Sequence, residues 1–138
     1  MTAILDTSFF VSLTNPAEVN HAACLRVAGA LNESLIVPQV ILPETTYLIA
    51  KYQGSPVMRT FVKRLLSPSW QLEPLQGADL ARASALLDRY ADLDLDFADA
   101  CIVALAERLN VRRLLTLDRR HFAAIRPQHC PAFDILPR

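Results

Sequence analysis

The most constraining feature of this sequence is a helical stretch over residues 97–109 that carries apolar side chains on almost every face. A surface helix would show an apolar stripe on one side and polar residues on the other. The apolar character on all sides predicts that this helix is buried. The rest of the chain must therefore build a core around it.

Two acidic residues stand where this buried helix begins. Asp96 and Asp99 are three positions apart, so they share one face of the first turn, where the helix dipole favours negative charge by roughly 0.3–1 kcal/mol each. That contribution is too small to account for two buried carboxylates. For Asp96, an ordinary N-cap and a functional role both stay open. For Asp99, which leads directly into the apolar run, we favour a bound cation.

Length and composition indicate one folded domain without an overall positive charge. The chain has 138 residues, of which 52% are hydrophobic, which suits a single domain over residues 1–138 and excludes intrinsic disorder. Its 14 basic and 14 acidic residues cancel. Because no global field attracts polyanions, any nucleic-acid site would have to be local.

The sequence carries no signal for export or membrane insertion. Its 3 cysteines, Cys24, Cys101 and Cys130, are odd in number and widely spaced, as is typical of reduced, cytosolic proteins. The N-terminal region lacks a basic segment, and no apolar run approaches the roughly 20 residues of a membrane span. We expect a cytoplasmic protein without membrane contact.

Short apolar runs alternate with segments of helical periodicity along the chain. The predicted strands are residues 3–5, 34–37, 70–75, 113–117 and 133–136. The predicted helices are residues 18–31, 39–54, 55–66, 78–90 and 97–109, and residues 119–122 are expected to form a turn. This order predicts an α/β protein with three α/β/α layers and a central, mostly parallel sheet.

Five acidic residues are expected to meet at one edge of this sheet. Asp6 and Asp118 follow predicted strands, whereas Glu44, Asp96 and Asp99 lie near the starts of predicted helices. In open parallel sheets, ligands bind outside the carboxyl ends of the strands, and helices entered directly from strands begin at that edge. The sequence therefore predicts a cluster of carboxylates there.

The residue types at this edge favour metal-assisted hydrolysis. The only glycines are Gly29, Gly54 and Gly77, so no dinucleotide-binding or P-loop motif is present. The 3 histidines are not spaced as a zinc site, and we expect His121 to be an ordinary surface residue. A nearly pure oxygen-ligand set suits Mg²⁺ or Mn²⁺. Such an ion positions a phosphodiester and activates water, so phosphodiester hydrolysis is the natural reaction.

Four motifs resemble, in order and spacing, the acidic positions of PIN-domain nucleases. They are ILDTSFF with Asp6, LPETTYLI with Glu44, DFADACIVALAERL with Asp99, and LLTLDRRHF with Asp118. The resemblance spans essentially the whole chain and looks closest to the VapC-like ribonuclease toxins of type II toxin–antitoxin modules. Pro43, before Glu44, departs from the small or apolar residue more usual there.

The resemblance implies a PIN-like fold, a role for each acid and two partners. Asp6 and Asp99 would be the principal metal ligands, with Glu44 and Asp118 completing the catalytic pocket. Thr7 and Thr116 would support them, and Asp96 is a possible additional ligand. The implied substrate is RNA, cleaved with Mg²⁺ or Mn²⁺, and the implied protein partner is a small cognate antitoxin.

Two further expectations concern binding surfaces. Arg119 and Arg120 directly follow Asp118, so we expect them to contact RNA phosphates beside the acids. The helices predicted over residues 39–54 and 55–66 carry more apolar residues than one side of a small sheet needs, which favours a homodimer or a partner helix. These residues are Ile49, Tyr52, Val57, Met58, Phe61 and Val62.

Two alternatives stay open at this stage. Asp6 could carry an aspartyl phosphate, as in haloacid-dehalogenase-like phosphatases or receiver domains. However, Ser8 stands where the phosphatases need a second Asp, and the only lysines are Lys51 and Lys63. The chain could also be a non-catalytic PIN-like binding scaffold whose acids merely cap helices.

Overall fold

The computed structural model describes residues 2–31 and 33–138. In chain order, the strands are β1 (Ile4–Leu5), β2 (Leu35–Pro38), β3 (Trp70–Glu73), β4 (Arg113–Leu115) and β5 (Asp134–Leu136). The helices are α1 (Thr7–Thr14), α2 (His21–Ala30), α3 (Leu42–Gln53), α4 (Ser55–Arg64), α5 (Gly77–Arg89), α6 (Phe97–Leu109) and α7 (Arg119–Ala124). Two short 3₁₀ turns, η1 (Gln39–Ile41) and η2 (Ala91–Leu93), precede α3 and α6.

The five strands form one sheet in the order β3-β2-β1-β4-β5, and every neighbouring pair is parallel. The sequence predicted a mostly parallel sheet, which these pairings confirm, and β3 lies at one edge of it. The first strand, β1, is central, where Ile4 pairs with Ile36 on one side and with Leu114 on the other. Both β1 residues are completely buried, as expected of a central parallel strand.

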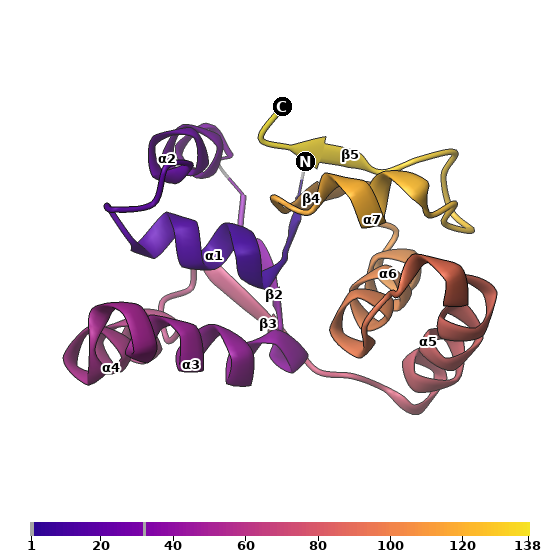
Figure 1. Cartoon of the computed structure of the whole chain (residues 1–138), viewed down its shortest axis with the longest axis horizontal. Coiled ribbons are helices and arrows are strands. Elements are labelled where there is room, and N and C mark those ends of the chain that lie inside the picture. Colours follow the sequence, from indigo (N-terminus) through magenta and orange to yellow (C-terminus); the bar gives the residue numbers. More distant parts are fainter. Residues whose placement is uncertain (1, 32) are drawn as a thin grey trace.

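The helices cover both faces of the sheet, as the sequence predicted. Figure 1 shows α1 to α4 gathered on one side of the strands and the α5–α6 pair on the other. On the α1 side, the Phe10 ring packs against Phe61 of α4 and Trp70 of β3, with ring centroids 4.9 and 5.1 Å apart. These contacts join α1, α4 and the edge strand into one hydrophobic layer.

Helix α6 has the bounds and burial that its sequence predicted. It runs from Phe97 to Leu109, and every residue from 99 to 106 is buried. It packs mainly against α5 and contacts η1 as well. This burial explains the all-round apolar pattern, because consecutive residues of α6 are shielded from solvent on every face.

Two helices were not predicted. Helix α1 begins directly after β1, where the sequence indicated only a turn, because Phe9, Phe10 and Val11 are consecutive buried residues without a helical stripe. Helix α7 lies where residues 119–122 were expected to turn, and Phe122 anchors it in the core with no exposed surface. In both helices, tertiary burial and an N-terminal cap determine a conformation that periodicity does not reveal.

Several boundaries also differ from the predictions. The strands predicted over residues 70–75 and 113–117 end at Glu73 and Leu115. The helix predicted from residue 39 begins as the 3₁₀ turn η1, so that Pro43 falls in the first turn of α3, where its missing N–H costs little. Within the described part of the chain, no helix combines the length and the apolar character needed to cross a lipid bilayer.

Candidate metal centre

Asp6 occupies the position where β1 ends and α1 begins. Its backbone N–H donates to Leu115 O of β4 at 3.0 Å, which continues the sheet pairing one residue beyond the strand. Its side chain caps α1, since Oδ1 accepts a 2.7 Å hydrogen bond from the Thr7 N–H. The strand-to-helix transition therefore fixes this carboxylate at the carboxyl edge of the central strand.

Two hydroxyl groups hold the second oxygen of Asp6. Thr116 Oγ1 donates to Asp6 Oδ2 at 2.7 Å, and Ser8 Oγ donates to the same oxygen at 3.0 Å. Each hydroxyl also accepts a backbone N–H at 3.0 Å, Thr116 from Asp118 and Ser8 from Leu117. The segment after β4 is thus tied to the end of β1 through these two side chains.

Burial raises the pKa of Asp6 above its ordinary value of 3.8, and the negative charge of Asp118 adds to this effect. The hydrogen bonds from Thr116, Ser8 and the Thr7 backbone act in the opposite direction, because they favour the ionised form. The side chains around Asp6 therefore stabilise a buried carboxylate only in part, and a nearby positive charge would complete the stabilisation.

Asp96 and Asp99 open helix α6. Asp96 is the N-cap, with its Oδ1 accepting the Asp99 N–H at 2.8 Å, so the simple capping interpretation holds for this residue. Its exposed carboxylate also lines the same pocket as Asp6. Asp99 is 8% exposed. Its pKa is raised to about 7, first by burial and then by the charges of Asp96, Asp6 and Asp118.

Glu44 lies in the first turn of α3, and Asp118 follows β4. The pKa of Glu44 is raised by partial burial and by the charges of Asp96 and Asp6, although the residue is largely exposed. Asp118 caps α7, since its Oδ1 accepts the His121 N–H at 3.3 Å. The acids thus come from strand ends and helix starts at one sheet edge, as the topology predicted.

His121 belongs to this cluster, although the sequence indicated an ordinary surface residue. Its Nδ1 lies 2.7 Å from Asp118 Oδ2 and 4.0 Å from Asp99 Oδ2. The hydrogen bond to Asp118 and the charges of both acids raise the pKa of His121, while burial and Arg120 lower it. The sequence signal is the i, i+3 spacing of Asp118 and His121, which has meaning only once α7 is known to be a helix.

These side chains surround a pocket of about 260 Å³ at the carboxyl edge. Its lining comprises Asp6, Thr7, Ser8, Glu44, Leu48, Asp94, Asp96, Ala98, Asp99, Asp118 and His121. Of the predicted site residues, Thr116 lies behind this surface, fully buried against Asp6. Ser8, Asp94 and His121 were not predicted. Neither Lys51 nor Lys63 is among the lining residues, which weighs against the receiver-type alternative.

The two predicted RNA-binding arginines differ in their surroundings, and neither lines the pocket. Arg119 Nη1 donates to the backbone carbonyls of Ile135 and Pro137 at 3.1 and 2.8 Å, so its guanidinium holds the C-terminal segment. Arg120 is exposed and close enough to lower the pKa of His121. Arg120 is therefore the better placed of the two to meet a substrate phosphate.

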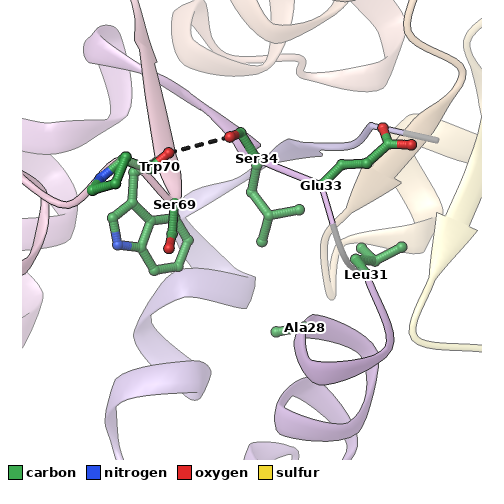
Figure 2. Close-up of a pocket in the computed structure, with 8 residues that line it drawn as sticks. Ala28, Leu31, Glu33, Ser34, Ser69 and Trp70 are labelled. Atoms are coloured by element: carbon green, nitrogen blue, oxygen red, sulfur yellow. Dashed lines mark hydrogen bonds between the residues drawn. The ribbon is translucent and has the colours of Figure 1, made fainter.

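A second, larger pocket of about 450 Å³ lies at the amino ends of β2 and β3. Figure 2 shows the side chains that line it. It is lined by Leu35 and Trp70, the first residues of β2 and β3, and by Ala28, Leu31, Glu33, Ser34, Pro68 and Ser69. Its described lining contains one ionisable side chain, Glu33. Because it faces the amino ends of the strands and lacks convergent ionisable groups, it does not compete with the acidic pocket as a reaction site.

The donor set of the acidic pocket fits a divalent cation. Ligand atoms of Asp99, Asp118 and His121 lie within 4.8 Å of one another, which is close to the spacing around one ion. Asp6, Asp99 and Glu44 all have raised pKa values because burial, and then like charges, disfavour their ionised forms. A bound cation would remove this repulsion, as carboxylates grouped at low dielectric require.

Comparison with known proteins gives consistent results. The PIN domain family model matches residues 3–126. The chain is 33% identical to Ribonuclease VapC26 of Mycobacterium tuberculosis over 134 residues, which cover 97% of this chain and 99% of that protein.

Two solved structures share the fold. The crystal structure of Mycobacterium tuberculosis VapC20, described as a Sarcin-Ricin loop cleaving toxin, matches with a TM-score of 0.82 at 21% identity, covering 88% of this chain and 94% of the other. A toxin–antitoxin complex from Klebsiella pneumoniae matches with a TM-score of 0.69 at 20% identity, covering 89% and 92%.

Proposed function

Because the chain belongs to the PIN domain family, we propose that it is a metal-dependent ribonuclease that acts as the toxin of a type II toxin–antitoxin pair. One observation carries the proposal: Asp6, Glu44, Asp99 and Asp118, from four distant parts of the chain, line a single pocket. The similarity of the chain to a ribonuclease over nearly the full length of both proteins supports RNA as the substrate. Membership of the PIN domain family weighs against aspartyl phosphate chemistry. The convergence of four acids in one pocket weighs against a scaffold whose acids merely cap helices.

Each carboxylate has a defined task in this proposal. Asp6 and Asp99 are the principal metal ligands, because they are the two most buried acids of the pocket. Glu44 and Asp118 are the further carboxylate ligands, and Asp96, whose Oδ1 is engaged as a cap, can contribute its second oxygen. Thr116, with Ser8 and the Thr7 backbone, fixes the orientation of Asp6.

The bound Mg²⁺ or Mn²⁺ would lower the pKa of a water molecule and neutralise charge on the scissile phosphodiester. Holding the RNA in place is a task for the protein's own side chains. The acids repel RNA, so a local cation must hold the flanking phosphates, and Arg120, whose charge acts on His121 of the pocket, is the candidate. The site of action would be the cytoplasm, where the RNA substrate is found.

A small antitoxin and a second copy of the chain are the proposed protein partners. Helices α3 and α4 expose Tyr47, Tyr52, Val57 and Val62, which are 63%, 62%, 37% and 44% accessible. Of the apolar residues expected to be in surplus there, Ile49 and Phe61 are instead buried in the chain's own core, and Met58 packs against it. The exposed remainder is the surface that we propose a partner covers.

RNA cleavage by purified protein with Mg²⁺, Mn²⁺ or EDTA tests the function. We expect cleavage of mixed structured RNAs with either metal, none with EDTA, and none by the Asp99→Asn variant. Asp88→Asn is the matched control, because Asp88 is an exposed acid of α5 outside the pocket. Cleavage that persists in EDTA or in Asp99→Asn protein would contradict the proposal.

A growth assay and a mass measurement test the biological role and assembly. Expression of the chain alone should arrest growth, and Asp99→Asn should relieve the arrest. Light scattering on the purified chain should give the mass of a dimer, and replacing Tyr52 and Val62 with Ser should shift it to a monomer. Growth without arrest would contradict the toxin role, and a monomeric wild-type chain would contradict the dimer.

A further inference from the structure

We propose that the metal centre contains a nitrogen ligand, the imidazole of His121, which together with Asp99 and Asp118 binds one divalent cation and makes the site prefer a first-row transition-metal ion such as Mn²⁺ to Mg²⁺. This inference rests on the proposed metal dependence of the pocket. It concerns a residue that was not among the metal ligands expected from the sequence.

The distances carry the first step. His121 Nδ1 lies 2.7 Å from Asp118 Oδ2 and 4.0 Å from Asp99 Oδ2. Around an octahedral ion with ligand distances of about 2.1 Å, adjacent ligand atoms are about 3.0 Å apart and opposite ones about 4.2 Å. The His121–Asp118 and His121–Asp99 separations therefore differ from these octahedral spacings by only a few tenths of an ångström, and the ligand atoms of all three side chains lie within 4.8 Å of one another.

The backbone around His121 carries the second step. The next residue, Phe122, is completely buried, and its ring packs edge-on against Phe133 with centroids 6.5 Å apart. At the other side, the His121 N–H is held by the carboxylate of Asp118. These contacts fix the main chain of His121, while its side chain remains 24% exposed and lines the pocket. The imidazole is thus presented to the pocket from a rigid position.

Donor chemistry carries the third step. Mg²⁺ is a hard cation that prefers oxygen ligands and keeps much of its water, whereas imidazole nitrogen is a common ligand of first-row transition-metal ions. When the ion enters, the ring nitrogen that now faces Asp118 releases any proton it carries to solvent and gives its lone pair to the metal. One nitrogen among carboxylates therefore shifts the preference of the site away from Mg²⁺.

Pulsed electron paramagnetic resonance of the Mn²⁺-loaded protein provides the direct test. A ligating imidazole gives ¹⁴N couplings on the Mn²⁺ signal, and these do not depend on RNA cleavage. We expect the couplings in the wild type. We also expect them in the control variant His21→Asn, because wild-type His21 bonds to Ser12 O and does not line the pocket. We expect them to be lost in His121→Asn.

Metal titration provides the second measurement. His121→Asn should weaken Mn²⁺ binding by about 10-fold or more, the scale seen when groups around a metal are removed, and Mg²⁺ binding by less. Wild-type protein that binds Mn²⁺ without ¹⁴N coupling, or folded His121→Asn that keeps the coupling, would overturn the nitrogen ligand alone. Wild-type protein that binds neither ion would overturn the proposed function as well. The wild-type spectrum decides the question even if the variant does not fold.

Discussion

Thr116 Oγ1 donates a 2.7 Å hydrogen bond to Asp6 Oδ2, and this bond joins residues 110 positions apart. Thr116 has no exposed surface, so solvent cannot replace its hydroxyl. Thr116 Oγ1 also accepts a hydrogen bond from the Asp118 N–H at 3.0 Å. One side chain therefore fixes the orientation of one acid of the pocket and the backbone of another.

Thr116→Val should weaken both the fold and metal binding. It removes a donor to Asp6 and leaves the Asp118 N–H without its acceptor, so we expect a loss of about 1–3 kcal/mol in unfolding free energy and a 10–100-fold loss of Mn²⁺ affinity. Calorimetric titration and denaturant unfolding measure the two effects. Thr116→Ser keeps the hydroxyl and should restore metal affinity. Equal metal binding by the Val and Ser variants would refute this role.

The acids could be placed from the sequence because topology determines their position. Strands separated by helices predict a parallel sheet, and acids after strands or at helix starts then meet at one edge. Asp6 and Asp118 follow β1 and β4, which are neighbours in the sheet. Helix α6 was equally clear, since its apolar residues cover every face.

Contacts that depend on an unpredicted helix could not be found in this way. His121 meets Asp118 because residues 119–124 form α7, whereas the sequence indicated a turn. Ser8 meets Leu117 because α1 begins directly at Thr7. The hydrogen bonds of Arg119 to Ile135 and Pro137 depend on how the C-terminal strand returns beside β4, which no local pattern encodes.

Asp99→Asn should stabilise the metal-free protein at neutral pH. The folded-state pKa of Asp99, about 7, lies above its ordinary value of 3.8, so between these values the folded state binds more protons than the unfolded state. Stability is therefore lost as pH rises from about 4 to 7. The raised pKa values of Asp6 and Glu44 act in the same direction, and the raised pKa of His121 does so above its ordinary value of 6.5.

The Asn variant cannot ionise and should lose part of this pH dependence. At pH 7.5 in EDTA we expect it to be more stable than the wild type by roughly 1–4 kcal/mol, since one pKa unit corresponds to 1.36 kcal/mol. Urea unfolding at pH 5 and pH 7.5 measures the difference. Saturating Mn²⁺ should stabilise the wild type and have less effect on the variant. A variant less stable than the wild type at both pH values would refute the charge-repulsion argument.

Arg119→Ala and Arg120→Ala should have different effects. Removing Arg119 breaks two hydrogen bonds to the C-terminal segment, so it should lower the free energy of unfolding by about 1–3 kcal/mol. Removing the exposed Arg120 should leave stability within about 0.5 kcal/mol. It should instead weaken RNA binding and reduce the slope of log K against log salt by about 0.7. An unchanged salt slope in Arg120→Ala would place the RNA path elsewhere.

Arg108→Met should destabilise the fold without impairing the metal centre. Arg108 of α6 bonds to Asp79 Oδ1 and Glu73 Oε1 at 3.0 Å each, and the Asp79 side chain is only 3% exposed. Loss of the cation leaves Asp79 buried without its ionic partner, which typically costs about 3–5 kcal/mol. Asp79→Asn in the Arg108→Met background should recover part of the loss, because it removes the unpaired charge.

Arg26→Ala is the control for this prediction. It lies at an exposed position of α2 and should change stability by less than about 0.5 kcal/mol. Mn²⁺ affinity per folded molecule should be the same in all of these variants, since none of the substituted residues lines the acidic pocket. Denaturant unfolding measures the change in stability, and metal titration at denaturant concentrations below the unfolding transition measures the change in Mn²⁺ affinity. An Arg108→Met protein with wild-type stability would show that this buried ion pair contributes nothing to the fold.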